Sequence, residues 1–211
     1  MASITIRKTP HEKNILLAAV LATCAAGSAM AQTAGESPWL VRLRAVHLDS
    51  ANGGSTSPDL GLSMNNKTIP EVDITYFFSP NLAAELVLTV PQRQTVYSNG
   101  TDIGTFKHLP PSLLMQYHFT NVQGFKPYVG AGVNYTRITN VNLASGTAGL
   151  EKSSVGGVLQ AGLDIPIDKK LSFNIDVKKV YLRSDVFLNG ANVGDFKIDP
   201  VLFGVGVGYR F

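Results

Sequence analysis

The strongest constraint in this sequence is a period-two alternation that confines charged side chains to one face of each segment. The C-terminal stretch FGVGVGYRF shows it most plainly. Successive side chains of a β-strand point to opposite faces, so Val205, Val207, Tyr209 and Phe211 share an apolar face, opposite glycines and Arg210. Chain termini tend to be polar and loosely ordered. A terminal strand with one wholly apolar face therefore indicates that this face contacts something other than water.

The same alternation recurs along the chain in segments of roughly ten residues. It predicts eight strands, at about residues 39–47, 69–78, 82–91, 108–119, 126–138, 155–165, 171–182 and 197–211. Short turn-forming links alternate with long polar links between these segments. Tight periplasmic turns and longer outside loops have this layout in outer-membrane barrels. The predicted fold is all-β, an eight-stranded antiparallel transmembrane β-barrel with short periplasmic turns and longer extracellular loops.

A soluble up-and-down barrel has similar spacing, so the two faces of the strands must decide between the folds. The chain is 45% apolar and only 16% charged, whereas an average soluble domain has roughly 25% charged residues. Lys179 is the one charged residue on the apolar faces. The opposite faces carry Arg42, Arg44, Glu71, Asp73, Glu85, Asp164, Asp176, Lys178 and Arg210. Because a charge on the lipid face costs roughly 2–4 kcal/mol at mid-depth, we expect the apolar faces to contact lipid and these nine residues to line the lumen.

Aromatic residues fall where the two membrane interfaces should lie. At the short-turn end they are Trp39, Phe78, Phe119 and Phe211, and near the long-loop end they are Tyr135 and Tyr181. Lys179 is expected near the outer rim, where its aliphatic stem can reach the interface.

Residues 1–31 have the features of a secretory signal peptide. The segment has a basic start, an apolar run and an A-x-A cleavage site, formed by Arg7, Lys8 and Lys13, by ILLAAVLATCAAG, and by Ala29-Met30-Ala31. The apolar run is shorter than the about 20 residues of a membrane helix. A lipoprotein signal at Cys24 is the alternative, although Thr23 is bulkier than the usual small residue before such a cysteine. Cleavage after Ala31 leaves a barrel of residues 32–211 without any cysteine.

Several stretches of the chain are similar to one known family. They are KHLPPSLLMQYHF at 107–119, KPYVGAGVNYT at 126–136, the closing GYRF, and LAAELVLTVP at 82–91. These stretches resemble the OmpW family of Gram-negative outer-membrane proteins, to which the alkane-import porins are related. The resemblance implies an eight-stranded barrel that passes small, mostly hydrophobic molecules across the outer membrane. It also implies that Tyr209 and Phe211 form the assembly signal read by the barrel-insertion machinery.

The resemblance further implies an apolar constriction in the lumen, for which Val87, Leu114 and Lys178 are the candidate residues. Val87 fits an apolar constriction, whereas Lys178 is a cation where an aromatic residue is expected. Two roles stay open for the inward charges as a group. They form an ion-paired filling that keeps the barrel rigid, or a polar constriction that selects what passes.

Three prolines predict a sideways exit for hydrophobic cargo. Pro91, Pro110 and Pro111 fall at the outer ends of the third and fourth segments. Proline has no N–H group to donate, so it weakens strand pairing. If the lumen is polar, we expect cargo to enter between the long loops and leave through the wall near these prolines.

The leading functional prediction is passive passage of small hydrophobic or amphipathic molecules. The alternative is a structural or recognition protein whose loops bind phage, bacteriocins or host surfaces. A membrane-embedded lipid enzyme would need a Ser nucleophile beside a His or Asp, and His47, Asp49 and Ser50 near the outer rim are weak candidates, so no catalytic residue is predicted. The histidines lack metal-ligand spacing and the net charge of +3 is too small to indicate nucleic acid. We expect no metal or cofactor, and as partners outer-membrane lipid, the assembly machinery and small hydrophobic solutes.

Overall fold

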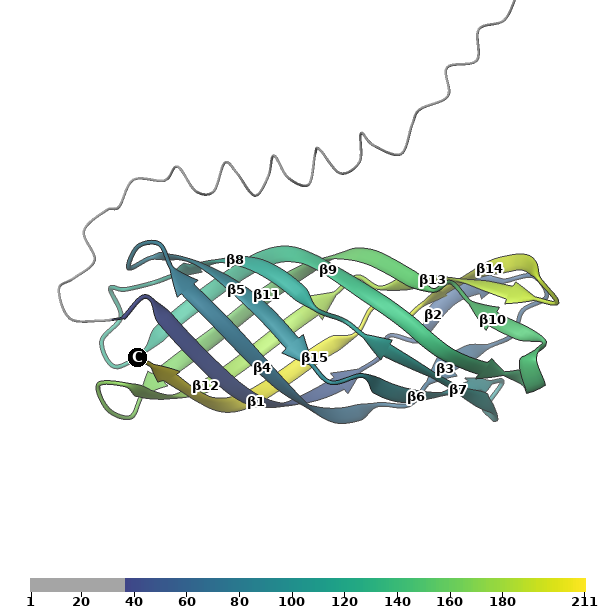
Figure 1. Cartoon of the computed structure of the whole chain (residues 1–211), viewed down its shortest axis with the longest axis horizontal. Helices are drawn as coiled ribbons and strands as arrows, with labels where there is room; N and C mark the ends of the chain where they lie inside the picture. The colour runs from purple at the N-terminus through teal and green to yellow at the C-terminus, as the bar shows by residue number, and fades with distance from the viewer. Residues whose placement is uncertain (1–36) are drawn as a thin grey trace, which may run out of the picture.

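The computed structural model describes residues 37–211, which form a closed antiparallel barrel (Figure 1). The expected signal peptide, residues 1–31, lies outside the described residues. Eight strands make the closed wall, in the spatial order β1 (Trp39–Asp49), β4 (Lys67–Phe77), β5 (Leu82–Thr89), β8 (Ser112–His118), β9 (Lys126–Leu143), β11 (Ser153–Pro166), β12 (Leu171–Val180) and β15 (Val201–Arg210). Within the described range, no helix is long and apolar enough to cross a membrane. The predicted eight-stranded fold is confirmed.

The first and last strands close this wall on each other. β1 pairs with β15 in a register that runs from Leu40↔Arg210 to Asp49↔Val201, and it pairs on its other side with β4. In hydrocarbon every backbone N–H and C=O needs a partner within the protein. Closure provides those partners because it removes the two free edges that an open sheet would keep.

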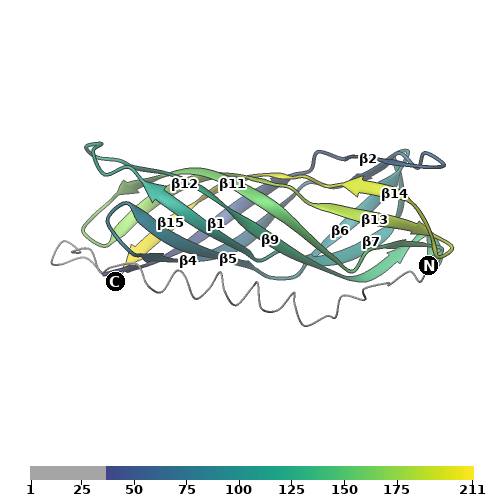
Figure 2. The same cartoon turned by 90° about the horizontal axis from the view of Figure 1, so that it is seen from above.

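The long links were expected to be loops, but they are largely β-structure. They contain β2 (Gly53–Thr56), β3 (Leu62–Met64), β6 (Gln92–Ser98), β7 (Thr101–Leu109), the short 3-10 turn η2 (Ala144–Gly146), β10 (Ala148–Leu150), β13 (Arg183–Leu188) and β14 (Ala191–Lys197). These strands pair with one another and with the upper part of β9, and so extend the wall beyond the eight-stranded ring (Figure 2). Their inward side chains, such as Val96, Phe106 and Phe196, are buried in one apolar cluster. Burial of this cluster explains why the links fold as strands.

Two predicted segments are shorter or broken in the structure, and proline is the reason. Segment 82–91 ends as a strand at Thr89, and segment 108–119 is split between β7 and β8 at Pro110 and Pro111. Because proline cannot donate to the ladder, regular pairing stops at these residues.

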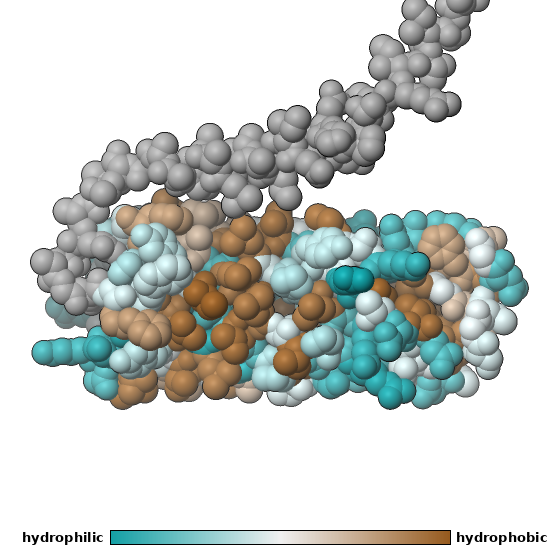
Figure 3. All heavy atoms as spheres, in the orientation of Figure 1, coloured by the Kyte–Doolittle hydropathy of each residue, from teal (hydrophilic) through white to brown (hydrophobic). Residues whose placement is uncertain are grey.

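The outward face of the eight-stranded ring is apolar. Its exposed side chains include Leu43, Val72, Leu86, Leu113, Val133, Ile175 and Val205. Figure 3 shows apolar side chains over the half of the wall nearer the C terminus and mostly hydrophilic side chains over the extension. Lys179 lies at the top of β12, where its ammonium group donates to the carbonyl of Asp199. A band of apolar surface of this kind is the lipid-facing surface of a transmembrane barrel.

Aromatic side chains are exposed at the lower end of this band, near the short turns. Trp39 and Phe78 lie there with the C-terminal pair Tyr209 and Phe211. The rings of Tyr209 and Phe211 meet edge to face, with centroids 5.1 Å apart. This group has the position of an interfacial aromatic girdle.

A charge at Val205 should destabilise the folded barrel. Val205 is 51% exposed and lies between Ala45 of β1 and Ile175 of β12, within the apolar band. In phospholipid vesicles, Val205→Lys should lower the free energy of unfolding by about 2–4 kcal/mol, because the ammonium group would lie in hydrocarbon. Denaturant titration of the refolded protein measures this change. The matched Val205→Leu variant should be close to wild type, and an equal loss in both variants would contradict a lipid-facing Val205.

Candidate functional site

Eight of the nine charged residues expected in the lumen form one buried network. They are Arg42, Arg44, Glu71, Asp73, Glu85, Asp164, Asp176 and Lys178, and each is at most 4% exposed. The ninth, Arg210, lies apart at the short-turn mouth of the barrel. Its guanidinium carbon is 4.3 Å from the centroid of the Phe77 ring, and its Nε donates to the carbonyl of Ser37 at 2.8 Å.

Arg42 links four strands of the wall through its guanidinium group. It donates to both carboxylate oxygens of Asp164 on β11, at 3.1 and 2.6 Å. Its Nη1 donates to Glu85 Oε2 on β5 at 2.8 Å and to Thr75 Oγ1 on β4 at 2.9 Å. A bidentate arginine–carboxylate pair fixes geometry as well as charge. Arg42 therefore holds β1, β4, β5 and β11 at a set spacing across the lumen.

Arg44 and Lys178 form ion pairs with the other carboxylates of the network. Arg44 Nη1 lies 2.8 Å from Asp73 Oδ2 and 3.1 Å from Glu71 Oε1. Lys178 Nζ lies 2.6 Å from Glu71 Oε1 and 2.8 Å from Asp176 Oδ1. Glu71 is thus shared between a cation of β1 and one of β12, two strands that β15 separates, and this contact joins β1, β4 and β12.

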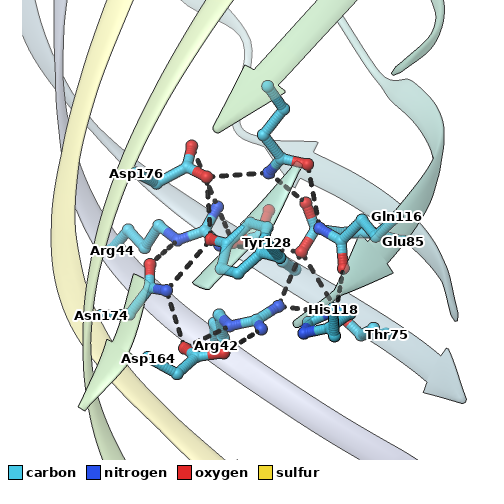
Figure 4. A network of polar contacts seen from close by, with 12 residues as sticks. Arg42, Arg44, Thr75, Glu85, Gln116, His118, Tyr128, Asp164, Asn174 and Asp176 are labelled. Atoms are coloured by element: carbon cyan, nitrogen blue, oxygen red, sulfur yellow. Dashed lines mark hydrogen bonds and ion pairs between the residues drawn. The ribbon is translucent and has the colours of Figure 1, made fainter. Parts of the chain in front are cut away.

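Tyr128 lies in the middle of the network (Figure 4). Its ring is 5.0 Å from the guanidinium carbon of Arg42. Its hydroxyl donates to Asp176 Oδ2 at 2.8 Å and accepts from Arg44 Nη2 at 3.1 Å. Gly162 makes room for this ring, because a Cβ there would come within 2.2 Å of Tyr128 Cζ. In a barrel of eight strands the lumen is just wide enough for side chains to fill, and here charged side chains and Tyr128 fill it.

The uncharged members of the network were not singled out from the sequence. They are Thr75, Gln116, His118, Tyr128, Gln160 and Asn174, which all hydrogen-bond within it. The signal that could have found them is their position in the alternation, because each lies on the same face of its strand as the inward charges.

The network contains five carboxylates but three cations. The nine charges expected in the lumen are five acids and four bases, and the surplus of acid in the network is larger because Arg210 lies outside it. Asp73 shows the surplus most clearly, since neither of its buried oxygens has a hydrogen bond of good geometry. Each cation is therefore shared among several carboxylates, and loss of a cation should cost more than loss of an acid.

Above the network the interior is mostly apolar, with a few buried polar side chains such as Gln94, His108 and Asn134. Val87 and Leu114, two of the candidate constriction residues, are 4% and 0% exposed and belong to the apolar cluster that continues into the extension. Lys178, the third candidate, lies in the charged network below. The structure thus separates the three candidates into two layers, an apolar one above and an ionic one beneath it.

The strand ladder is interrupted at the height of this apolar layer. The pairing of β5 with β8 ends at Val87↔Ser112, and the pairing of β6 with β7 begins at Gln92↔His108. Between these pairs lie Pro91 on one side and Pro110 and Pro111 on the other. On the far side the wall is intact, since Tyr135 N donates to Pro111 O at 3.0 Å and the Asn134 amide bonds both proline carbonyls at 3.1 Å. The seam between β8 and β9 is therefore bonded at the height where the seam between β5 and β8 is interrupted.

The weak catalytic candidates at the outer rim do not contact one another. The Ser50 hydroxyl donates to the carbonyl of Ile198 at 3.1 Å, and His47 Nδ1 lies 3.1 Å from Thr68 Oγ1. Asp49 accepts a hydrogen bond from the Asn66 amide at 2.7 Å. These contacts do not activate Ser50 as a nucleophile. Among residues 37–211, no group of His, Cys, Asp and Glu is placed to hold a metal ion.

His108 is the one buried histidine of the extension, above the membrane-spanning strands. It is 2% exposed, lies 3.5 Å from the Gln94 amide nitrogen and has no partner at Nδ1 within the described chain. Burial, with a smaller contribution from the charge of Lys67, lowers the pKa of His108 to about 4. The imidazole is therefore neutral at physiological pH.

Comparison with known proteins gives consistent results. Residues 42–211 match the model of the OmpW family. The uncharacterised outer-membrane protein y4mB of Sinorhizobium fredii is 42% identical over 84% of this chain and 82% of its own length. Outer membrane protein W of Escherichia coli is 33% identical over 95% of this chain and its whole length. The crystal structure of OprG from Pseudomonas aeruginosa superposes with a TM-score of 0.72 at 24% identity, covering 83% of this chain and 97% of OprG, which shows the shared fold.

Removing a cation from the network should cost far more stability than removing a carboxylate. Arg44→Met should lower the free energy of unfolding by about 3–5 kcal/mol, because buried carboxylates lose their partner. Asp73→Asn should change it by less than about 1 kcal/mol or raise it, because the network has surplus carboxylates. Denaturant titration in vesicles compares the two variants. If Asp73→Asn lowers the free energy of unfolding as much as Arg44→Met does, the network has no surplus of carboxylates and this explanation is wrong.

Stability should also depend on the protonation of His108. Its pKa is about 4 in the folded protein against an ordinary 6.5, so the unfolded chain takes up the proton first as the pH falls. The free energy of unfolding should therefore drop between about pH 6.5 and 4, by up to about 3 kcal/mol. Titrations at a series of pH values should show a shallower drop for His108→Gln. Equal slopes in wild type and variant would rule out a buried neutral His108 as the cause.

Proposed function

The chain belongs to the OmpW family, and from that premise we propose that it is a channel for passive passage of small hydrophobic or amphipathic molecules through the bacterial outer membrane. The observation that supports this most is the change of the interior from ionic to apolar at the height of the interrupted ladder. The apolar upper interior offers favourable contacts to a hydrophobic solute, and the ionic lower interior does not.

The charged network argues against a straight path through the barrel. Passage would require several buried ion pairs to separate, and breaking one such pair costs about 3–5 kcal/mol. A hydrophobic molecule would supply no hydrogen bonds or charges in return. In our proposal the network is both a rigid filling and a floor that keeps polar solutes and ions from crossing.

Cargo then leaves sideways through the seam between β5 and β8. It enters between the extracellular strands, passes along the apolar layer of Val87 and Leu114, and reaches lipid near Pro91, Pro110 and Pro111. A seam that lacks ladder hydrogen bonds at these residues can separate at a lower cost than paired strands. The lower wall, where β5 pairs with β8 from Leu82↔Tyr117 to Val87↔Ser112, stays closed.

The last strand carries the proposed assembly signal. Tyr209 on β15 and Phe211 directly after this strand are both exposed, next to the seam with β1 that closes the barrel. Exposure leaves both rings accessible to the barrel-insertion machinery before closure. Besides the channel and its lateral exit, we therefore propose that Tyr209 and Phe211 direct insertion of the barrel into the membrane.

Two proline replacements distinguish the effect of the seam between β5 and β8 from the effect of the neighbouring seam between β8 and β9. The carbonyl of Pro111 accepts from the backbone N–H of Tyr135 on β9. The carbonyl of Pro110 accepts from the side chain of Asn134 and, within residues 37–211, has no backbone partner on β9. Because successive residues of a strand alternate, we expect an N–H at position 110 to face β5 and one at position 111 to face β9. Pro110→Val supplies an N–H toward β5 and should close the seam, whereas Pro111→Val supplies one toward β9. Transfer of an alkane-like fluorescent probe into proteoliposomes should fall severalfold for Pro110→Val and for the double variant, and change little for Pro111→Val.

Unchanged transfer in folded Pro110→Val and double variants would overturn the lateral exit. Folding is checked by the shift in gel mobility between heated and unheated samples. Transfer that is equal with and without wild-type protein in the vesicles would overturn the channel itself.

A further inference from the structure

Three cations on neighbouring strands face outward just above the apolar band. Arg93 on β6, Lys107 on β7 and Arg137 on β9 are all exposed. Next to each cation, on the side of the apolar band, lies an apolar or aromatic residue that is exposed or half-exposed. These residues are Val90, which is 56% exposed, Leu109 and Tyr135, which is 51% exposed. Tyrosine is enriched at membrane–water interfaces, so Tyr135 marks the height at which the lipid head groups begin.

The strand register brings the three cations together. Arg93 pairs directly with Lys107, and Arg137 pairs with Leu109, two residues along β7 from Lys107. Side chains at directly opposed positions of an antiparallel pair have Cβ atoms about 4.5–5.5 Å apart, and like charges there are destabilising. A fourth cation, Lys67, reaches the same place from β4, where its Nζ donates to the carbonyl of Arg93 at 3.1 Å. We name Arg93, Lys107 and Arg137 the cationic patch.

Within residues 37–211 no carboxylate forms an ion pair with any member of the cationic patch. The neighbouring polar contact is neutral, from Arg93 Nε to Thr105 Oγ1 at 3.2 Å. Asp102, the acid nearest along β7, accepts the N–H of Gly104 at the hairpin tip. The repulsion between the opposed cations is therefore not compensated by the described chain.

A second pair of outward cations, on β12 and β13, is compensated. Lys179 donates to the carbonyl of Asp199, and Arg183 Nε lies 3.9 Å from Asp199 Oδ2. The two groups of outward cations differ in their internal counter-charge. This contrast indicates that the cationic patch is built for an anion that comes from outside the protein.

We propose that the cationic patch binds the phosphate groups of a phosphorylated lipid in the outer leaflet of the outer membrane. The position selects a lipid rather than a dissolved anion, because the apolar wall directly below accepts acyl chains while the cations meet the head group. Guanidinium groups bind phosphate in bidentate geometry, and two arginines flank the lysine. The bound lipid lies over β6, β7 and β9, beside the seam between β5 and β8.

Binding of defined lipids to the refolded protein in zwitterionic detergent tests the proposal. The probes are diphosphoryl lipid A, the same lipid after enzymatic removal of its phosphates, and inorganic phosphate. The test variant is Arg93→Gln/Lys107→Gln/Arg137→Gln, and the matched control is Lys179→Gln/Arg183→Gln. Native mass spectrometry gives the affinities, and the midpoint of thermal unfolding, read by gel mobility, gives the stabilisation by lipid.

Each cation near an anionic head group should contribute about fivefold to affinity, so the triple variant should bind diphosphoryl lipid A about 100-fold more weakly. The control should change little, and dephosphorylated lipid should bind weakly to wild type and variants alike. Without lipid A, the triple variant should unfold at the same or a higher temperature than wild type, because the opposed like charges are gone. If the triple variant folds poorly, Lys107→Gln alone should show a fivefold loss.

Three results would overturn the proposal. They are unchanged affinity of the folded triple or Lys107→Gln variant, an equal loss in the Lys179 and Arg183 control, and equal binding of dephosphorylated lipid. Displacement of lipid A by millimolar inorganic phosphate would likewise show that the patch is a site for dissolved anions and not for a lipid.

Discussion

The structure depends on the requirement that no backbone hydrogen-bonding group is left unpaired in hydrocarbon. The pairing of β1 with β15 meets it, because it turns eight strands into a wall without edges. Once the wall is closed, the alternation along each strand gives an outer surface and an inner surface, and a side chain on one surface cannot contact a side chain on the other. Side chains such as Val205 contact lipid and those such as Arg42 are sealed inside, where they must find partners among themselves.

The sealed charges explain how the interior is divided. Arg42, Arg44 and Lys178 each reach carboxylates on other strands, and Tyr128 fills the space between them. Above this layer the inward side chains become mostly apolar, and the wall itself becomes irregular where proline interrupts the ladder. An ionic floor, an apolar interior and a weakened seam at one height together support the proposed sideways route. The cationic patch beside that seam adds an expected lipid neighbour at the place where cargo would leave the wall.

The sequence predicted the fold and the face of each membrane strand, because few folds besides a membrane barrel combine alternation over about ten residues with charges confined to one face. It did not predict the extracellular strands, since residues such as Val96 and Phe196 stand in short segments rich in polar and turn-forming residues. It placed Lys178 on the correct face but not in the correct layer, because height along the barrel depends on the register between strands. The same reason explains why Arg210 was grouped with the network. Tyr128 was missed because only the charged residues of the inward faces were singled out, although the alternation places it on such a face. Register also creates the opposition of Arg93 and Lys107, which no motif in the sequence reveals.

The central claim is that the charged network seals the periplasmic half of the barrel. The conductance of the refolded wild-type protein in planar bilayers tests it most directly, on samples that also transfer the alkane-like probe. The account predicts no steady conductance at any salt concentration while probe transfer continues. A stable conductance that rises in proportion to salt concentration would show a continuous water-filled lumen and would contradict the account.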